Sequence, residues 1–428
     1  MDKINLKYLD EVVYHEKLDN GLNIYVLRKK DYHTFSCYFI TNFGALIDEF
    51  IPINEKEYHK FPKGVAHFLE HKMFEQETGP NVMDKFSSLL GTCNAFTNYE
   101  YTAYYVNGAD NFKENLIFLI DYVQSPYFTD ENVEKEKGII DQERLMTLDQ
   151  PERTFSLKIL SNIFNNYEYG KTVVGEKEDI YSITKEDLYR CYNTFYNPSN
   201  MSIVVVSNEE EEKVINLIKE NQSKKKFDKQ GTIKIKETKE DKKVSKEYDV
   251  IYDNVEKPKV SYNIKINLPE IKEDLDLVGL SLRILLVSNF SKMSDFNLEL
   301  KNKNIIDDNI GFSIGKFIDY GLITIRSNTI KEEEFLDKVK NKFKSLELSK
   351  EKFELIKKTF IANTVYSFTT THGIMGYLLD EYFDKRKIKE DYFSKLKEFT
   401  YEKYIEIINK IDFSNDNITI MRPLDEKE

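Results

Sequence analysis

Apolar and polar residues follow two different periods along the chain. Short runs rich in β-branched and aromatic residues predict strands over residues 24–27, 36–41, 99–106, 260–266 and 321–326. Longer amphipathic stretches predict helices, the clearest over residues 111–123 and 350–366. Both halves of the chain mix the two patterns. They predict an α+β fold with mainly antiparallel sheets and helices packed on one face.

The end of the first half recurs at the end of the second half. Thr184 is a predicted N-cap of a helix that leads to an apolar strand at residues 200–205. Thr400 is a predicted N-cap of a helix that leads to a similar strand at residues 417–421. A repeat of half the chain length implies that one domain has been duplicated.

A charged segment separates the two copies. Residues 209–222 predict the closing helix of the first half, and residues 223–246 are rich in Lys, Glu and Asp with few large apolar side chains. This composition predicts a solvated linker or an exposed hairpin. The predicted domains are therefore residues 1–222 and 247–428, a division that suits a chain of 428 residues.

Residues 67–71 form an H-x-x-E-H motif in a chain that has only six histidines. The flanking apolar residues predict a helix, on which His67 and His71 lie on one face and can reach one metal ion. Zinc at a catalytic site takes three protein ligands and keeps a position for a water, whose pKa falls to about 7. Glu70 is placed to act as the base toward that water, and this order of residues is an inverted zincin motif. The alternative is that the three residues are ordinary surface or core residues.

A third ligand is expected downstream of the motif. Residues 130–146 predict an acidic helix, on which Glu136 and Glu143 lie seven positions apart, two turns along one face. One of the two carboxylates can bind metal while the other supports it. A charge-rich helix can equally be a solvated face, and the residues alone leave both interpretations open.

The charge balance limits the partners. Acidic residues outnumber basic ones by 74 to 62, giving a formal net charge of −12, which argues against nucleic acid as the main partner. The amino terminus has no basic start followed by an apolar core, and no stretch approaches about 18 apolar residues. We therefore expect no membrane association and a cytoplasmic location. The three cysteines lack ligand-like pairing, which fits a reducing compartment.

Four motifs follow one another in the first half: GVAHFLEHKMF at residues 64–74, GTCNAFT at 91–97, SPYF at 125–128 and EKGIIDQE at 136–143. In this order they strongly resemble the M16 family of metallopeptidases, which includes insulin-degrading enzyme, pitrilysin and the mitochondrial processing peptidase. The resemblance is close in the first half and holds only in outline in the second. It is nearest to the bacterial YmfH-like branch, whose members carry labels linking them to modification of the translation factor EF-P.

The resemblance implies a role for each charged residue of the motifs. His67, His71 and Glu143 would be the ligands of one zinc ion, Glu70 the general base, and Glu136 a carboxylate that orients the site. It also implies the M16 fold, similar to that of LuxS, with two homologous domains in a clamshell arrangement. The second half has no H-x-x-E-H motif, so we expect one Zn²⁺ per chain.

The segment over residues 94–106 alternates and is rich in Tyr and Thr, which predicts a strand. In the family, the strand beginning at the position of Asn94 resembles an edge onto which a substrate peptide adds through backbone hydrogen bonds. The resemblance therefore places substrate contacts at Asn94, Ala95 and Phe96. An ordinary sheet strand would show the same pattern.

The second half departs from the family. Active M16 enzymes place an Arg and a Tyr, seven positions apart, where they help to stabilise the oxyanion. In the corresponding stretch, residues 296–307, Glu299 stands for the Arg and Ile306 for the Tyr. We therefore expect a homologous M16 subunit to supply the missing pair, with a homodimer as the alternative.

Two functions from different classes fit these observations. The first is a zinc-dependent endopeptidase that hydrolyses unfolded peptides by an activated water, as the catalytic subunit of a two-subunit enzyme. The second is a non-catalytic metal-binding scaffold subunit in a complex linked to translation-factor modification. The missing Arg and Tyr favour the scaffold. Glu70 favours the enzyme, because a structural zinc site needs no base beside an open position.

Overall fold

The computed structural model describes residues 1–385, 388 and 392–427, which form two compact units. The first unit contains Met1–Thr147, Thr172–Glu237 and helix α14 (Thr371–Lys385). The second contains Leu148–Lys171, Thr238–Asn363 and the chain from Tyr392 on. The units therefore do not follow the expected division at residues 222 and 247, because a helical segment of each half packs into the unit formed mainly by the other half.

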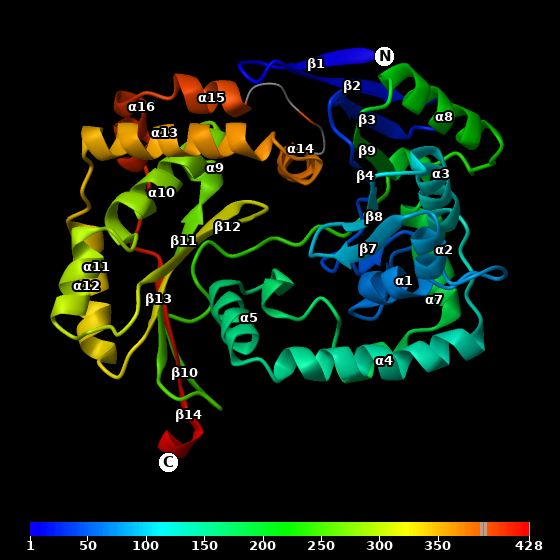
Figure 1. Ribbon diagram of the computed structural model, residues 1–428. Helices are drawn as coiled ribbons and strands as arrows, with labels where there is room; N and C mark the ends of the chain where they lie inside the picture. Colours follow the sequence, from blue (N-terminus) through cyan, green and yellow to red (C-terminus); the bar gives the residue numbers. More distant parts are fainter. Residues whose placement is uncertain (386–387, 389–391, 428) are drawn as a thin grey trace. The chain divides into compact units, whose positions relative to one another are not determined.

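The first unit is built on a seven-stranded sheet in the order β1-β2-β3-β9-β4-β8-β7 (Figure 1). Its neighbouring strands are antiparallel except for β3 and β9, which run parallel. The strands are β1 (Asp2–Leu6), β2 (Glu11–Lys17), β3 (Asn23–Arg28), β4 (Phe35–Thr41), β7 (Gly91–Thr97), β8 (Thr102–Gly108) and β9 (Met201–Ser207), and β5 (Glu49–Phe50) pairs with β6 (His59–Lys60) separately.

Every residue of β4 and β9 is buried, which requires cover on both faces of this sheet. On one face, a large apolar core joins alternate strand residues to α1, α3, α7 and α8. On the other, residues such as Tyr38 and Val204 pack against Ile374 and Leu378 of α14. The α+β class is confirmed, but helices cover both faces of this sheet. The helices are α1 (Val65–Met73), α2 (Val82–Ser88), α3 (Phe112–Val123), α4 (Asp130–Leu148), α6 (Lys177–Ser182), α7 (Lys185–Phe195), α8 (Glu211–Ser223) and the 3₁₀ helix η2 (Pro198–Asn200).

The second unit repeats the order of five strands of the first, β3-β9-β4-β8-β7. Its five-stranded sheet has the order β10-β14-β11-β13-β12, and β10 and β14 form its parallel pair, as β3 and β9 do in the first. The strands are β10 (Tyr248–Asp253), β11 (Lys259–Asn267), β12 (Gly311–Phe317), β13 (Tyr320–Asn328) and β14 (Asp416–Pro423). The helices are α5 (Pro151–Ile163), η1 (Glu168–Gly170), α9 (Leu268–Ile271), α10 (Leu275–Phe290), α11 (Asp295–Asn302), α12 (Glu332–Lys344), α13 (Lys350–Ser367), α15 (Tyr392–Glu398), α16 (Tyr401–Ile408) and η3 (Leu424–Glu426).

The predicted helix caps of the repeat are present in both units. The side chain of Thr184 accepts a hydrogen bond from the backbone N–H of Asp187 at the start of α7. The side chain of Thr400 accepts one from the backbone N–H of Lys403 at the start of α16. Each helix is followed by the strand that pairs in parallel in its sheet, β9 or β14. The same local sequence signal therefore marks the same position in both units.

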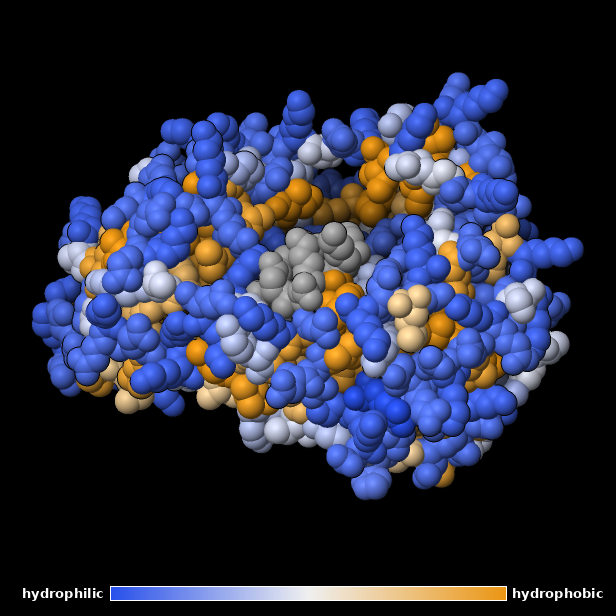
Figure 2. Space-filling view, turned by 90° about the horizontal axis from the view of Figure 1, so that it is seen from above, coloured by the Kyte–Doolittle hydropathy of each residue, from blue (hydrophilic) through white to orange (hydrophobic). Residues whose placement is uncertain are grey.

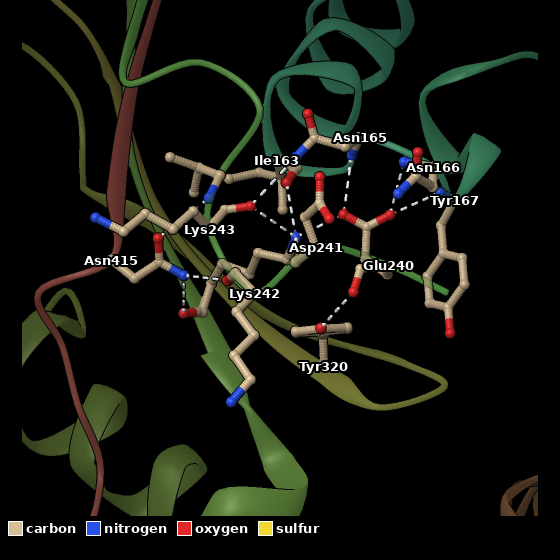
Figure 3. A network of polar contacts seen from close by, with 12 residues as sticks. Ile163, Asn165, Asn166, Tyr167, Glu240, Asp241, Lys242, Lys243, Tyr320 and Asn415 are labelled. Atoms are coloured by element: carbon tan, nitrogen blue, oxygen red, sulfur yellow. Dashed lines mark hydrogen bonds and ion pairs between the residues drawn. The ribbon is translucent and has the colours of Figure 1, made fainter. Parts of the chain in front are cut away.

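Residues 223–246 are mostly exposed, as their composition predicts, but some of them also make contacts within each unit. In the first unit, Ile235 forms a β-bridge with Phe50, so this stretch extends the small sheet of β5 and β6. In the second unit, the side chains of Glu240 and Lys265 are fully buried and form an ion pair with 2.7 Å between Oε1 and Nζ. Figure 3 shows Glu240 among the polar groups around it. The segment has few apolar residues because its buried contacts are made by backbone groups and a charge pair.

The predicted strand over residues 94–106 is a β-hairpin. β7 ends at Thr97, β8 begins at Thr102, and the two strands pair antiparallel. In the turn, Asn98 Oδ1 accepts hydrogen bonds from the backbone N–H groups of Glu100 and Tyr101, at 2.8 Å each. An asparagine side chain replaces the usual glycine or proline signal, so the alternating pattern continues through the turn.

Hydrophilic side chains cover most of the face of the molecule seen in Figure 2. None of the helices in the described part of the chain is both long enough and apolar enough to cross a membrane.

Candidate metal centre

Helix α1 carries the H-x-x-E-H motif and begins at a position that only glycine can occupy. Gly64, its N-cap, has φ 80°, and a Cβ there would lie 2.0 Å from the carbonyl oxygen of Val174. His67 and Glu70 are each 7% exposed, and His71 is partly buried. The ring centroids of the two histidines are 4.6 Å apart, as expected for residues one helical turn apart. The helix thus presents two imidazoles side by side.

Helix α4 brings Glu143 opposite both histidines. Its Oε1 lies 3.5 Å from His67 Nε2, and its Oε2 lies 3.3 Å from His71 Nε2. Among the described residues, these three side chains form the one group whose ligand atoms could hold a metal ion, all within 4.8 Å of one another. Ligand atoms of a tetrahedral zinc stand about 3.4 Å apart when each bond is about 2.1 Å. Two imidazole nitrogens and one carboxylate therefore fit a zinc ion in chemistry and in spacing.

Glu136 lies behind the cluster, two turns before Glu143 on α4. Its Oε1 is 3.0 Å from His71 Nδ1, and because a carboxylate only accepts, the ring nitrogen donates. This bond leaves His71 Nε2 directed toward Glu143, as in the carboxylate–histidine pairs that orient metal ligands. Glu136 and Glu143, which the resemblance implies as a supporting carboxylate and a third ligand, thus both contact the histidines of α1.

Contacts between the carboxylates and the histidines shift the pKa values of Glu143, Glu136 and His71. Hydrogen bonds from His67 and His71 keep the pKa of Glu143 well below its usual range. Burial would raise the pKa of Glu136, but the bond to His71 and the charges of His71 and Lys72 hold it below its ordinary value. Burial would lower the pKa of His71, but its bonds to Glu136 and Glu143 raise it to about 9. The carboxylates of Glu136 and Glu143 therefore favour positive charge at His71.

Glu70 faces a different neighbour from the three clustered side chains. Thr97, at the end of β7, donates a hydrogen bond of 2.7 Å from Oγ1 to Glu70 Oε2. Thr97 Oγ1 also lies 3.1 Å from Thr102 Oγ1, which donates to the carbonyl oxygen of Phe43. The edge of β7 therefore holds the carboxylate of Glu70 through Thr97, and Glu70 is not one of the three clustered side chains.

β7 is one of the two edge strands of its sheet, and β1 is the other. Asn94 is exposed, and its Oδ1 accepts a hydrogen bond of 2.8 Å from the backbone N–H of Ala95. Ala95 packs against the core that contains α1, whereas Phe96 packs against the core that contains α14. The three residues predicted to bind substrate therefore lie on the edge strand but do not share one face of it.

Two exposed apolar residues flank Glu143 on α4. Ile139 is 49% exposed and Met146 is 65% exposed. They lie four residues before and three residues after Glu143, which places both beside it on the helix surface. Exposed large apolar side chains next to a possible reaction centre can contact an apolar part of a ligand.

The residues at the expected Arg and Tyr positions have structural contacts in the second unit. Glu299 on α11 forms ion pairs of 2.7 Å with both Lys303 and Lys338. Ile306 is 3% exposed and belongs to the apolar core. Neither side chain can stabilise an oxyanion, because one is negatively charged and the other is apolar.

Sequence reasoning did not single out two residues that contact carboxylates of the site. Thr97 contacts Glu70, and Lys72 contacts Glu136. The alternation of the strand could have placed Thr97 on the same face as Ala95. Lys72 is a lone cation among apolar residues of α1, and its side chain is fully buried. That contrast is visible in the sequence, although its partners on α4 are not.

The same fold occurs in solved structures. An M16-like peptidase from Alicyclobacillus acidocaldarius has a TM-score of 0.88 and 25% identity, covering 96% of this chain and 98% of that one. A protease from Helicobacter pylori has a TM-score of 0.82 and 18% identity, covering 96% and 99%. The likeness to the Helicobacter pylori protease concerns the fold alone.

The sequence comparisons identify the family. Residues 54–177 match the family model described as insulinase (peptidase family M16), and residues 182–360 match the one described as peptidase M16 inactive domain. A Bacillus subtilis protein named "Uncharacterized zinc protease YmfH" is 37% identical over 337 residues, 78% of each chain. The chain belongs to the M16 peptidase family.

Proposed function

We propose that the chain is a zinc-dependent endopeptidase that hydrolyses unfolded peptides. The observation that carries this proposal is the buried Glu70 carboxylate, held by Thr97 beside two histidines and Glu143. A site that only stabilised the fold would need no ionisable group in that position. The relatives named zinc proteases support the same conclusion.

The residues of the chain divide the work as follows. His67, His71 and Glu143 would hold zinc, which when bound supplies a Lewis acid that polarises a peptide carbonyl and lowers the pKa of a water. Glu70 takes a proton from the attacking water on its carboxylate and returns it to the leaving amine. Thr97 keeps the carboxylate in place during both transfers. The free edge of β7, with Asn94, Ala95 and Phe96, would pair with the backbone of the peptide.

We further propose that the chain is the zinc-bearing member of a two-subunit M16 peptidase. The support is the chemistry of Glu299 and Ile306, which leaves the oxyanion without the expected Arg and Tyr. A homologous subunit that carries the Arg and the Tyr would supply the missing donors, whereas a second copy of this chain would have the same Glu299 and Ile306. We assign the reaction to the cytoplasm because the three free cysteines suit a reducing compartment.

A metal-binding scaffold subunit is the second candidate. It is favoured by Glu299 and Ile306, which cannot replace the expected Arg and Tyr. It is also favoured by the family model that matches residues 182–360, which is described as an inactive domain. In that role the metal would hold the fold within a complex, and Glu70 would have no chemical task.

Metal content and turnover test these proposals separately. Glu143→Gln should weaken zinc binding by about 100-fold or more, since removing a ligand costs more than the 10–100-fold typical of a residue behind it. Glu134→Gln, an exposed carboxylate on the same helix, is the matched control. Adding a homologous M16 subunit should raise peptide turnover manyfold. A full rate from the isolated chain would contradict the two-subunit proposal and leave the peptidase proposal intact.

A further inference from the structure

Lys72 follows the H-x-x-E-H motif directly, and its side chain is 0% exposed. Its Nζ donates to the carbonyl oxygen of Asn132 at 3.0 Å and lies 2.7 Å from Glu75 Oε2 and 3.8 Å from Glu136 Oε2. A buried ammonium is costly unless it is paired, and an apolar side chain would fill the same space more cheaply. The charge at this position is therefore to be explained by the groups it contacts.

Two of those groups, Asn132 and Glu136, lie on consecutive turns of α4, whereas Glu75 follows the end of α1. Asn132 and Glu136 are four residues apart, so Lys72 contacts one face of the helix at two levels. The start of this helix is itself fixed, because Thr129 and Asn132 exchange hydrogen bonds between side chain and backbone. Lys72 thus joins the motif helix to a firmly capped part of α4.

Both oxygens of Glu136 face a cationic or donor group of α1. Oε1 accepts from His71 Nδ1 at 3.0 Å, and Oε2 faces Lys72 Nζ at 3.8 Å. Rotation of the carboxylate would break the first contact and lose the attraction of the second. The position of Glu136 in turn decides how the His71 ring is oriented, because this carboxylate receives its Nδ1–H.

We propose that Lys72 is a positioning residue for the metal site: it holds Glu136 in the orientation that directs His71 Nε2 toward Glu143. The inference rests on the proposed zinc site and extends it to a residue that touches neither metal nor substrate. Lys72 acts through Glu136, so its effect on zinc affinity requires the Glu136 carboxylate. A lysine that only stabilised the contact between α1 and α4 would alter unfolding and leave zinc affinity unchanged.

The test measures the dissociation constant of Zn²⁺ by competition with a chelator. Lys72→Met keeps the approximate volume and removes the charge, and we expect zinc binding to weaken by about 10–100-fold, as for other residues behind metal ligands. Glu136→Gln should weaken binding to a similar extent. The double variant should bind zinc about as well as Glu136→Gln alone, because Lys72 has no separate route to the metal.

Lys137→Met is the matched control, since Lys137 is also buried, lies next to Glu136 on α4 and pairs with Glu134. Its zinc affinity should stay within about twofold of the parent protein, well outside the range expected for Lys72→Met. If Lys72→Met does not fold, Lys72→Gln removes the charge while keeping an N–H donor and carries the same expectation.

The outcomes are distinct. Unchanged zinc affinity in a folded Lys72 variant would overturn the inference, as would fully additive effects of the Lys72 and Glu136 substitutions. Failure of the parent chain to bind zinc would instead contradict the proposed metal site itself.

Discussion

Removing the cation from the buried pair of the second unit should strongly destabilise that unit. Lys265 Nζ donates to the Glu240 carboxylate and to the carbonyl oxygens of Ile163, Asp241 and Lys243, at 2.7 to 3.1 Å. Glu240 also accepts backbone hydrogen bonds from residues 165–167. The pair therefore joins three segments of the unit, and Lys265→Met leaves a buried carboxylate without its cation.

The size of the effect follows from the burial of both side chains, which are 0% exposed. Breaking a buried ion pair by removing one partner costs about 3–5 kcal/mol, whereas an exposed pair contributes about 0–1 kcal/mol. For a unit of this size, we expect the midpoint of thermal unfolding to fall by about 6–20 °C. Replacing both partners, in Lys265→Met with Glu240→Gln, should recover much of the loss, because no buried charge is left.

The difference between parent and variant should also depend on pH. Burial acts to raise the pKa of Glu240, but Lys265 and the backbone N–H groups hold it below its ordinary value of 4.5. A group with a lowered pKa stabilises the folded state above its unfolded pKa, and this stability is lost as the pH falls. The gap between the two proteins should therefore narrow below about pH 4.5.

Calorimetric unfolding of the parent, the two variants and Lys242→Gln measures these differences. Lys242 lies in the same segment as Glu240 and forms an exposed ion pair with Glu270. It therefore provides the control for loss of a lysine charge. If Lys265→Met unfolded at the same temperature as Lys242→Gln, or if the double substitution recovered nothing, the reasoning about the buried pair would be refuted.

Three further predictions concern the first unit. Thr97→Val should lower kcat by about 10–100-fold without changing zinc affinity, since a hydrogen bond to a charged group contributes about 1.5–3 kcal/mol. Thr92→Val on the same strand is the control, and an unchanged kcat in Thr97→Val would contradict the role of Thr97. Leu378→Ala on α14 should destabilise the unit by about 2–5 kcal/mol in thermal unfolding. Leu355→Ala, at a side chain that is 64% exposed, should have little effect. Equal effects of the two substitutions would argue against α14 as part of the core that covers β4 and β9. Met146→Ser should lower kcat/KM about tenfold for peptides with apolar side chains and not for peptides with polar ones, with Leu145→Ser as the control. An equal loss of kcat/KM for both kinds of peptide would exclude a role of Met146 in specificity.

Local patterns predicted which side chains of the candidate metal site share a helix face, because these side chains are spaced by helical turns. His67 and His71 are one turn apart on α1, and Glu136 and Glu143 are two turns apart on α4. The meeting of the two helices could not be read from periodicity, and the family resemblance supplied it. The contact of Lys72 with Asn132 was missed for the same reason, since it joins residues of different helices.

Packing of distant segments was the main feature that the sequence did not show. The apolar face of α14 indicates that it is covered, but not that β4 and β9 of the first unit cover it. The burial of Glu240 depends on Lys265, which lies outside the charged segment. A charged stretch has the same composition whether a charge faces water or a buried partner, so the sequence of residues 223–246 did not show that the Glu240 side chain is buried.

The most direct test of the central claim is hydrolysis of a mixed library of quenched fluorescent peptides by the zinc-loaded chain, alone and with a homologous M16 subunit. Glu70→Gln, with its zinc content confirmed, is the control because it keeps the proposed ligands and removes the base. The account predicts zinc-dependent cleavage that disappears in Glu70→Gln. Equal cleavage by both proteins, or none by either when zinc and the second subunit are present, would contradict it.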